Sequence, residues 1–138
     1  MSPVNVDYRA HADAVRELLV AALPPNRVFD ADAVPGSPPN PGTLPPIYVV
    51  PHLSGMPPEG PARSSGVYST GSWRINVSIS GRSADEVRRT QWRVRQALDE
   101  AQLTVGDDWA QVAYSGIENL PERDEGRYFA ALEFTYTL

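Results

Sequence analysis

Residues 72–81, Ser-Trp-Arg-Ile-Asn-Val-Ser-Ile-Ser-Gly, decide the fold of this 138-residue chain. Apolar and polar residues alternate strictly along the stretch. The apolar set is Trp73, Ile75, Val77 and Ile79, and the polar set is Ser72, Arg74, Asn76, Ser78 and Ser80. A period of two predicts a strand with one buried face and one face that meets water or a polar partner. Gly81 ends the strand.

A helix is expected directly after this strand. Ser83-Ala84-Asp85-Glu86 has the spacing of a capping box, in which Ser83 and Glu86 satisfy each other's free amides. The helix is predicted to reach about Gln102, with a buried stripe of Val87, Gln91, Val94, Leu98 and Ala101. Asp85 with Arg89, and Arg95 with Asp99, are expected to pair across one helical turn.

The rest of the chain supplies a second helix and several strands. The predicted elements are a helix from Asp7 to Leu23 that ends at Pro24-Pro25, a short strand Arg27–Asp30, a strand Ile47–Leu53 with Pro51 at a strand edge or end, a strand around Trp109–Ser115, a turn-rich link 116–126, and a final strand 127–138. In the final strand Tyr128, Ala130, Leu132, Phe134, Tyr136 and Leu138 share one face.

This order predicts an α+β fold. We expect one domain over residues 1–138, with two layers: a mixed or antiparallel sheet of about four to five strands, and two helices on one face. Two proline-rich loops interrupt it, at about 31–46 and 54–69. The first carries six prolines and two glycines, which favours an extended surface loop. Loops of this length are commonly functional.

The composition leaves little for catalysis. The chain has no cysteine, and all twelve of its basic side chains are arginines, which excludes thiolate sites, Schiff-base lysines and P-loops. His11 is predicted to pack beside the first helix, and His52 has no acid and nucleophile partner by motif. Asp30 with Asp32, and Asp107 with Asp108, lack calcium-loop spacing. We therefore expect no catalytic residue, metal or cofactor.

Charge and hydropathy restrict the partners and the location. The net charge of −5 argues against specific nucleic-acid binding. The sequence has neither an apolar run long enough to cross a membrane nor a secretory signal at residues 1–7, so we expect a protein made in the cytoplasm.

The surface features predict an interface. The candidate residues are Arg74, Asn76 and Ser78 on the polar strand face, Arg88, Trp92 and Arg95 off the helix stripe, Glu122 and Asp124 in the acidic link, and Pro38, Pro39, Met56 and Arg63 in the loops. Two interpretations of the acidic link are possible: it is a solvated hairpin loop, or it lies at the rim of an interface and pairs with arginines of a neighbouring copy.

The chain resembles the tail-terminator (tail-completion) proteins of long-tailed bacteriophages. The resemblance covers most of its length and rests on the order of its elements and on the residue composition around them. These are the helix that ends at Pro24-Pro25, the strand Ile47–Leu53 with its proline-rich approach, the loop before Trp73, the capped helix from Ser83 and the closing strand 127–138.

The resemblance implies a role in virion assembly. Members of this family form a ring, usually a hexamer, that stops growth of the tail tube and joins the tail to the head. It implies contacts with a second copy, with the tail tube protein and with a head-completion or neck protein, at the head-proximal end of the tail. It carries over no catalytic residue. A negative charge suits a ring through which DNA passes. The alternatives are another neck or head-closure protein, a small ligand-binding regulatory α+β domain, and an enzyme of unrecognised type.

Overall fold

A computed structural model describes residues 8–24, 27–37, 39–56, 71–119 and 121–138, apart from the side chains of Met56 and Ile117. In chain order the elements are α1 (Tyr8–Ala22), β1 (Ile47–Met56), β2 (Ser72–Gly81), α2 (Ala84–Leu98), β3 (Gln102–Val105), β4 (Asp108–Gln111), β5 (Ala113–Glu118), β6 (Glu122–Asp124) and β7 (Arg127–Thr137).

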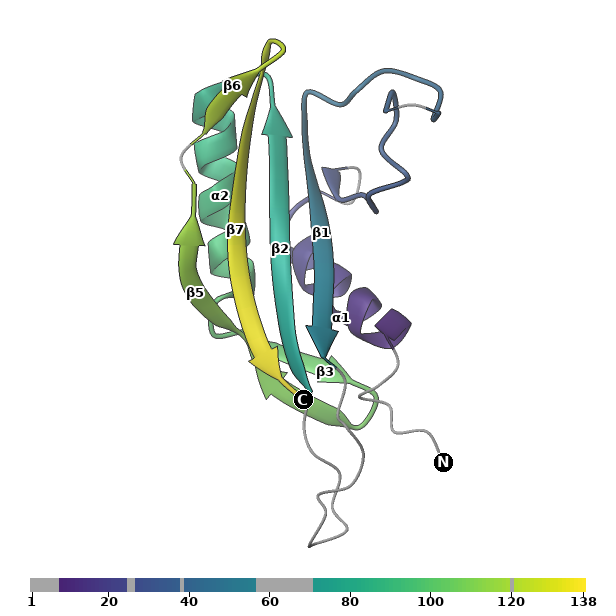
Figure 1. Cartoon of the computed structure of the whole chain (residues 1–138), viewed down its shortest axis with the longest axis vertical. Helices are drawn as coiled ribbons and strands as arrows, with labels where there is room; N and C mark the ends of the chain where they lie inside the picture. Colours follow the sequence, from purple (N-terminus) through teal and green to yellow (C-terminus); the bar gives the residue numbers. More distant parts are fainter. Residues whose placement is uncertain (1–7, 25–26, 38, 57–70, 120) are drawn as a thin grey trace, which may run out of the picture.

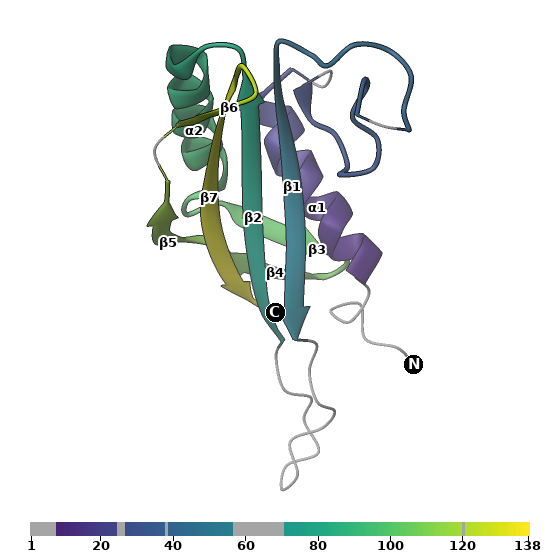
Figure 2. The same cartoon turned by 45° about the horizontal axis from the view of Figure 1, so that its top comes forward.

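Five of these strands form one antiparallel sheet. Its order is β1-β2-β7-β5, and β6 also pairs with β7. Both helices lie behind this sheet, and the separate β3–β4 hairpin crosses behind its lower end (Figures 1 and 2). The predicted two-layer α+β fold, with both helices on one face, is confirmed.

The core forms where alternate residues of the three long strands meet the helices. Ile75 of β2 lies between Leu53 and Phe134, and Val77 lies between Pro51 and Leu132. The buried residues predicted for β2 and β7 are confirmed, except that Tyr128 is half-buried. From the helices, Val15, Leu19, Val87, Val94 and Leu98 complete the core.

Two strand glycines allow close packing on this inner face. A Cβ on Gly55 would lie 2.4 Å from Cε3 of Trp73, the residue opposite it across the strands. A Cβ on Gly81 would lie 2.9 Å from Cγ2 of Val87. Gly55 therefore leaves room for an indole ring, and Gly81 lets α2 approach the sheet.

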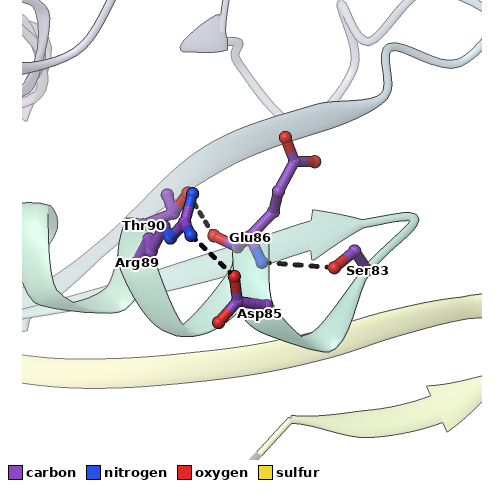
Figure 3. A network of polar contacts seen from close by, with 5 residues as sticks. All are labelled: Ser83, Asp85, Glu86, Arg89 and Thr90. Carbon is purple, nitrogen blue, oxygen red and sulfur yellow. Dashed lines mark hydrogen bonds and ion pairs between the residues drawn. The ribbon is translucent and has the colours of Figure 1, made fainter.

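The start of α2 follows the sequence prediction in part. Ser83 is the N-cap, and its Oγ accepts a hydrogen bond from the Glu86 amide at 3.4 Å (Figure 3). The Glu86 carboxylate points away from Ser83, so the capping box is one-sided (Figure 3). The predicted Asp85–Arg89 ion pair is present at 3.0 Å, and the Thr90 hydroxyl donates to the Glu86 carbonyl.

The prediction for the end of α2 was wrong. The helix ends at Leu98, Asp99 is its C-cap, and Glu100 takes a positive φ of 63° without being glycine. The chain then turns into β3, whose first residue, Gln102, was predicted to be helical and whose other residues were assigned to no element. Ala101 consequently lies outside the stripe, and Thr90 is buried in it instead.

Three further predictions need correction. The strand expected around Trp109–Ser115 is two strands, β4 and β5, which belong to different sheets. The link 116–126 includes the end of β5 and all of β6. Of the short strand predicted at Arg27–Asp30, the structure has one parallel bridge between Val28 and Val49.

Pro51 lies in the middle of β1, which is tolerated because β1 is an edge strand. The Val49 carbonyl accepts a hydrogen bond from the Phe29 amide on the outer side of β1. Residues two positions apart in a strand direct their backbone N–H and C=O groups to the same side. Position 51 therefore directs its backbone to the free edge, as Val49 does, and proline has no N–H to donate there. A missing donor blunts an edge strand against pairing with another chain. The edge position predicted for Pro51 is confirmed.

Candidate functional site

The outer face of the sheet, opposite the helices, carries the polar strand residues singled out in the sequence. Across β1, β2 and β7 the outward residues form matched rows, such as Val50-Ser78-Ala131. Arg74 and Asn76 are exposed and Ser78 is half-exposed, as predicted. Arg74 Nε lies 3.2 Å from a carboxylate oxygen of Glu133, so its charge is balanced within the chain.

The first proline-rich loop lies beside the upper part of β1 (Figure 1), and its residues Ala31, Val34 and Ser37 line one hollow together with outward residues of the strands. Val34 of the loop is 3% exposed and Val50 beneath it is 6% exposed. The Asn40 side-chain amide donates to the carbonyls of Asp32 and Val34, at 2.7 and 3.1 Å. The described residues of 31–46 form a surface loop, as expected, but its first half is compact and not extended, because an apolar residue and a side-chain bridge hold it in a turn.

Arg127 holds the end of the same loop to the sheet. Its guanidinium donates to Ser80 Oγ at 2.9 Å and to the Pro45 carbonyl at 2.8 Å. It also lies over the ring of Tyr48, 5.4 Å from the centroid. A charged donor shared between strand and loop makes a stronger contact than neutral hydrogen bonds would. The outer face is therefore shaped by the loop and fixed at Arg127.

Between the loop and the strands lies a groove of about 350 Å³. Its apolar lining comes from Val34 of the loop, Val50 of β1, and Phe129 and Ala131 of β7. Phe129 is 38% exposed, which is unusual for an aromatic side chain in the middle of a sheet face. The groove is concave and its lining is mixed: Ser78 stands between Val50 and Ala131, and His52, Ser80 and Asn119 also line it. Apolar surface with a few polar groups is common in binding sites.

The sequence contains an indication of the groove, namely apolar residues at strand positions that face outward, but the alternating pattern alone did not identify it. Val50, Phe129 and Ala131 are apolar residues at outward positions of their strands. An outward face that is fully wet would carry polar residues there. That these positions meet one another and the loop depends on the strand register and on the loop's return, neither of which is encoded locally.

On the opposite layer, α2 presents an exposed basic and aromatic surface. We call Arg88, Trp92 and Arg95 the Trp92 patch; the three residues recur at positions i, i+4 and i+7 of the helix, and all are exposed. The Trp92 side chain is 61% exposed. The predicted position of all three outside the buried stripe is confirmed.

The predicted Arg95–Asp99 ion pair does not form in the described part of the chain. Asp99 Oδ1 instead accepts the Tyr114 amide at 3.2 Å, which satisfies a carboxylate at the unfavourable end of the helix. The Arg95 guanidinium lies over the Tyr114 ring, 4.3 Å from its centroid. The Tyr114 hydroxyl donates to a Glu118 carboxylate oxygen. The Trp92 patch thus continues sideways onto β5.

The acidic link forms a hairpin between β6 and β7. Glu125 and Gly126 both have positive φ, 50° and 82°, which is the pattern of a two-residue type I′ turn. Glu122 lies opposite Phe129, and Asp124 lies opposite Arg127. Directly opposed residues share a face of the sheet, so both carboxylates belong to the outer face beside the groove. Both residues are exposed.

The two histidines lie in different surroundings, and neither belongs to a catalytic group among the described residues. His11 is fully buried, as predicted; its Nδ1 lies 2.6 Å from the Tyr136 hydroxyl, and its ring stacks on Trp73 at 4.0 Å. His52 is exposed on β1. Across the described ranges there is no cluster of three or more residues able to hold a metal ion. No helix within those ranges is long and apolar enough to cross a membrane.

The remaining loop candidates are only partly described. Pro39 is exposed. Pro38 and Arg63 lie outside the described residues, as does most of the second proline-rich loop. Met56 is the last residue of β1, opposite Ser72, so the strand extends into the region predicted as loop.

Comparisons with known proteins support the fold. No protein-family model matches the chain. A search of curated proteins finds no match. Among solved structures, the chain is similar to a protein of the virion of a native gene transfer agent (GTA) particle, with a TM-score of 0.57 and 20% sequence identity. The alignment covers 94% of this chain and 89% of the other. At that identity the similarity establishes that the two proteins share a fold over nearly their whole lengths.

Proposed function

We propose that this chain is a structural protein of a phage-type virion. In this role it forms a ring at the head-proximal end of the tail, ends polymerisation of the tail tube and provides the surface that joins the tail to the head. The observation that carries the proposal is the structural similarity over nearly the full length to a protein of a virion. The resemblance of the sequence to tail-terminator proteins, which rests on the order of its elements, supports the finer role.

The kinds of surface that the chain presents agree with a structural role. The groove, the Trp92 patch and the acidic hairpin are surfaces for contact: the groove lies between strands and a loop, the patch on α2 and the hairpin on β6 and β7. The groove is lined chiefly by valine, alanine and phenylalanine in its apolar part, with no metal cluster in the described residues. Such surfaces provide affinity through burial of apolar area and matching of charge. An enzyme or a small-ligand regulatory domain remains an alternative that would also use this groove.

The partners follow from the proposed position. One surface of the ring contacts the tail tube protein, and another contacts a head-completion or neck protein. DNA passes through the ring without specific binding, which suits the net charge of −5.

The experiment is removal of the gene from the virus or element that encodes the chain, followed by electron microscopy of the particles. A tail terminator predicts tubes that grow beyond their normal length and carry no heads, with normal tails restored when the wild-type chain is supplied in trans. Tails of normal length with detached heads would indicate the other neck or head-closure role instead. Normal, infectious or transfer-competent particles would contradict a structural role altogether.

A further inference from the structure

The Trp92 patch is a basic surface on an acidic protein. Neither Arg88 nor Arg95 forms an ion pair within the described residues, where the ion pairs are Arg9–Asp13, Arg74–Glu133 and Arg89–Asp85. Trp92 is exposed between them. Tryptophan and arginine are the residue types most enriched among those that dominate binding energy at protein interfaces.

The groove has the complementary properties. It is concave, and Val50, Phe129 and Ala131 give it an apolar part beside Ser78. The carboxylates of Glu122 and Asp124 stand on the same sheet face, Glu122 directly across from Phe129 of the groove. These carboxylates are also without an ion pair in the described part of the chain. An exposed aromatic ring between two positive charges therefore matches a hollow with the Glu122 carboxylate beside it, while Asp124 stands opposite Arg127 on the same face.

The two surfaces cannot meet within one chain. The patch belongs to α2, which lies behind the sheet (Figure 2). The groove is lined by outward residues of β1, β2 and β7, and Glu122 and Asp124 share that outer face. A contact between them joins the back of one copy to the front of the next. Such a head-to-tail contact is heterologous, and it produces a closed ring when the rotation between copies closes.

Pairing of sheet edges is the competing way to join copies, and the edges are poorly suited to it. On β1, Pro51 removes a donor and the Val49 carbonyl is already occupied by the Phe29 amide. On β5, the pairing with β7 is irregular between Tyr114 and Glu118, and Gly116 has a positive φ of 82°. A proline and a bulge both disfavour addition of a further strand.

We infer that the Trp92 patch of one copy binds the outer-face groove of a second copy of this chain, with Trp92 against Val50, Phe129 and Ala131, and with Arg88 and Arg95 facing Glu122 and Asp124. This contact rests on the proposed function, since it is the interface between neighbouring subunits of the proposed ring. It names the two surfaces through which the ring closes.

The absence of cysteine from the chain gives a direct test. Gln96→Cys places a thiol one helical turn from Trp92, and Ala131→Cys places one in the groove. Both variants are treated with a short bismaleimide under the conditions in which the wild-type chain assembles, alone or on tail tubes. Each variant by itself should give no cross-link, an equal mixture should give dimers, and the double variant should give a ladder that stops at the subunit number of the ring.

Substitutions test the chemistry of the same contact. Trp92→Ser should weaken self-association by about tenfold or more, whereas Trp109→Ser should leave it unchanged, although Trp109 is also 61% exposed. Arg88→Glu and Glu122→Arg should each weaken association, and the two together should restore it to within about threefold of wild type. Melting curves of all variants check that the fold is retained.

The outcomes separate this contact from the proposed function. A wild-type chain that forms rings, combined with no cross-link in the mixture or with equal losses for Trp92→Ser and Trp109→Ser, would overturn the contact and leave the proposed function standing. If either single variant cross-links with itself, copies meet through the same surface, back to back or front to front. That result would contradict the contact between the Trp92 patch and the groove. A wild-type chain that assembles under no condition would overturn both.

Discussion

His11 of α1 and Tyr136 of β7 lie 125 positions apart in the sequence, yet the His11 Nδ1 atom and the Tyr136 hydroxyl are 2.6 Å apart in the core. Both side chains stack with Trp73 of β2, at centroid distances of 4.0 and 6.2 Å. This polar contact joins the first helix to the last strand. It belongs to the fold and not to a catalytic site.

The first prediction concerns the stability that this contact provides. Tyr136→Phe removes the hydroxyl and keeps the ring, so apolar packing is retained while a buried hydrogen bond is lost. We expect the free energy of unfolding to fall by about 1–2 kcal/mol, measured by urea denaturation. Tyr48→Phe, at a half-exposed tyrosine on the outer face, is the matched control and should change stability by much less. An equal effect at both positions would contradict a role for the His11–Tyr136 bond.

The second prediction is a loss of stability at alkaline pH. Burial raises the pKa of the Tyr136 phenol above its ordinary value of 10.0. Near pH 10 the phenol ionises in the unfolded chain, whereas in the folded chain it stays neutral. The free energy of unfolding is therefore unaffected by this group below about pH 10 and decreases as the pH rises above it. Denaturation curves between neutral pH and about pH 11 should show the decline in wild type and a smaller one in Tyr136→Phe. Burial also raises the pKa of Tyr114, followed by the effect of Glu118, so Tyr114→Phe should be measured alongside. A decline of the same size in wild type and Tyr136→Phe would assign it to other groups.

The third prediction tests the assignment of the two sheet faces. Ile75 and Phe134 are fully buried opposite each other on the inner face. Truncation of either to alanine should cost about 2–5 kcal/mol, and Val77→Ala should cost less because fewer atoms are removed. Asn76→Ala, next in the strand but on the outer face, is the control and should stay within about 0.5 kcal/mol of wild type. A small loss at Ile75 and Phe134 would mean that the buried faces are assigned wrongly.

The parts of the fold that the sequence predicted are those with a strong local pattern. Alternation over ten residues identified β2 and its buried side, and the capping residue at Ser83 located the start of α2. The end of α2 was missed because Asp99 and Glu100 are not typical helix-ending residues, and a non-glycine residue with positive φ has no simple sequence signal. A four-residue strand such as β3 is too short for periodicity to separate it from the helix before it.

The candidate site was predicted as a set of residues but not as an arrangement. The polar strand face, the exposed side of α2 and the acidic link were all recognised as surfaces. The placement of the acidic link on the outer face follows from the register of β6 against β7, which is set by the turn at Glu125 and Gly126. The groove depends on the return of the loop over Val50, which is a tertiary contact that composition does not encode.

The fourth prediction concerns the loop that shapes the groove. Arg127→Ala removes the donors to Ser80 and Pro45, and hydrogen bonds from a charged group contribute about 1.5–3 kcal/mol each. Amide exchange of residues in the 31–46 loop should therefore accelerate by about tenfold or more, while exchange in β2 stays unchanged. Arg123→Ala, at an exposed arginine on β6, is the control and should leave the loop unaffected. Fast exchange of the loop in wild type would contradict the packed arrangement.

The proposed function requires that copies of this chain assemble into a closed ring. Native mass spectrometry of the purified chain, with negative-stain imaging of the same sample and with tail tube protein added in a second arm, tests it most directly. We expect one dominant oligomer that appears as a closed ring, either in the free protein or on the end of the tube. A monomer at every concentration in both arms would contradict it.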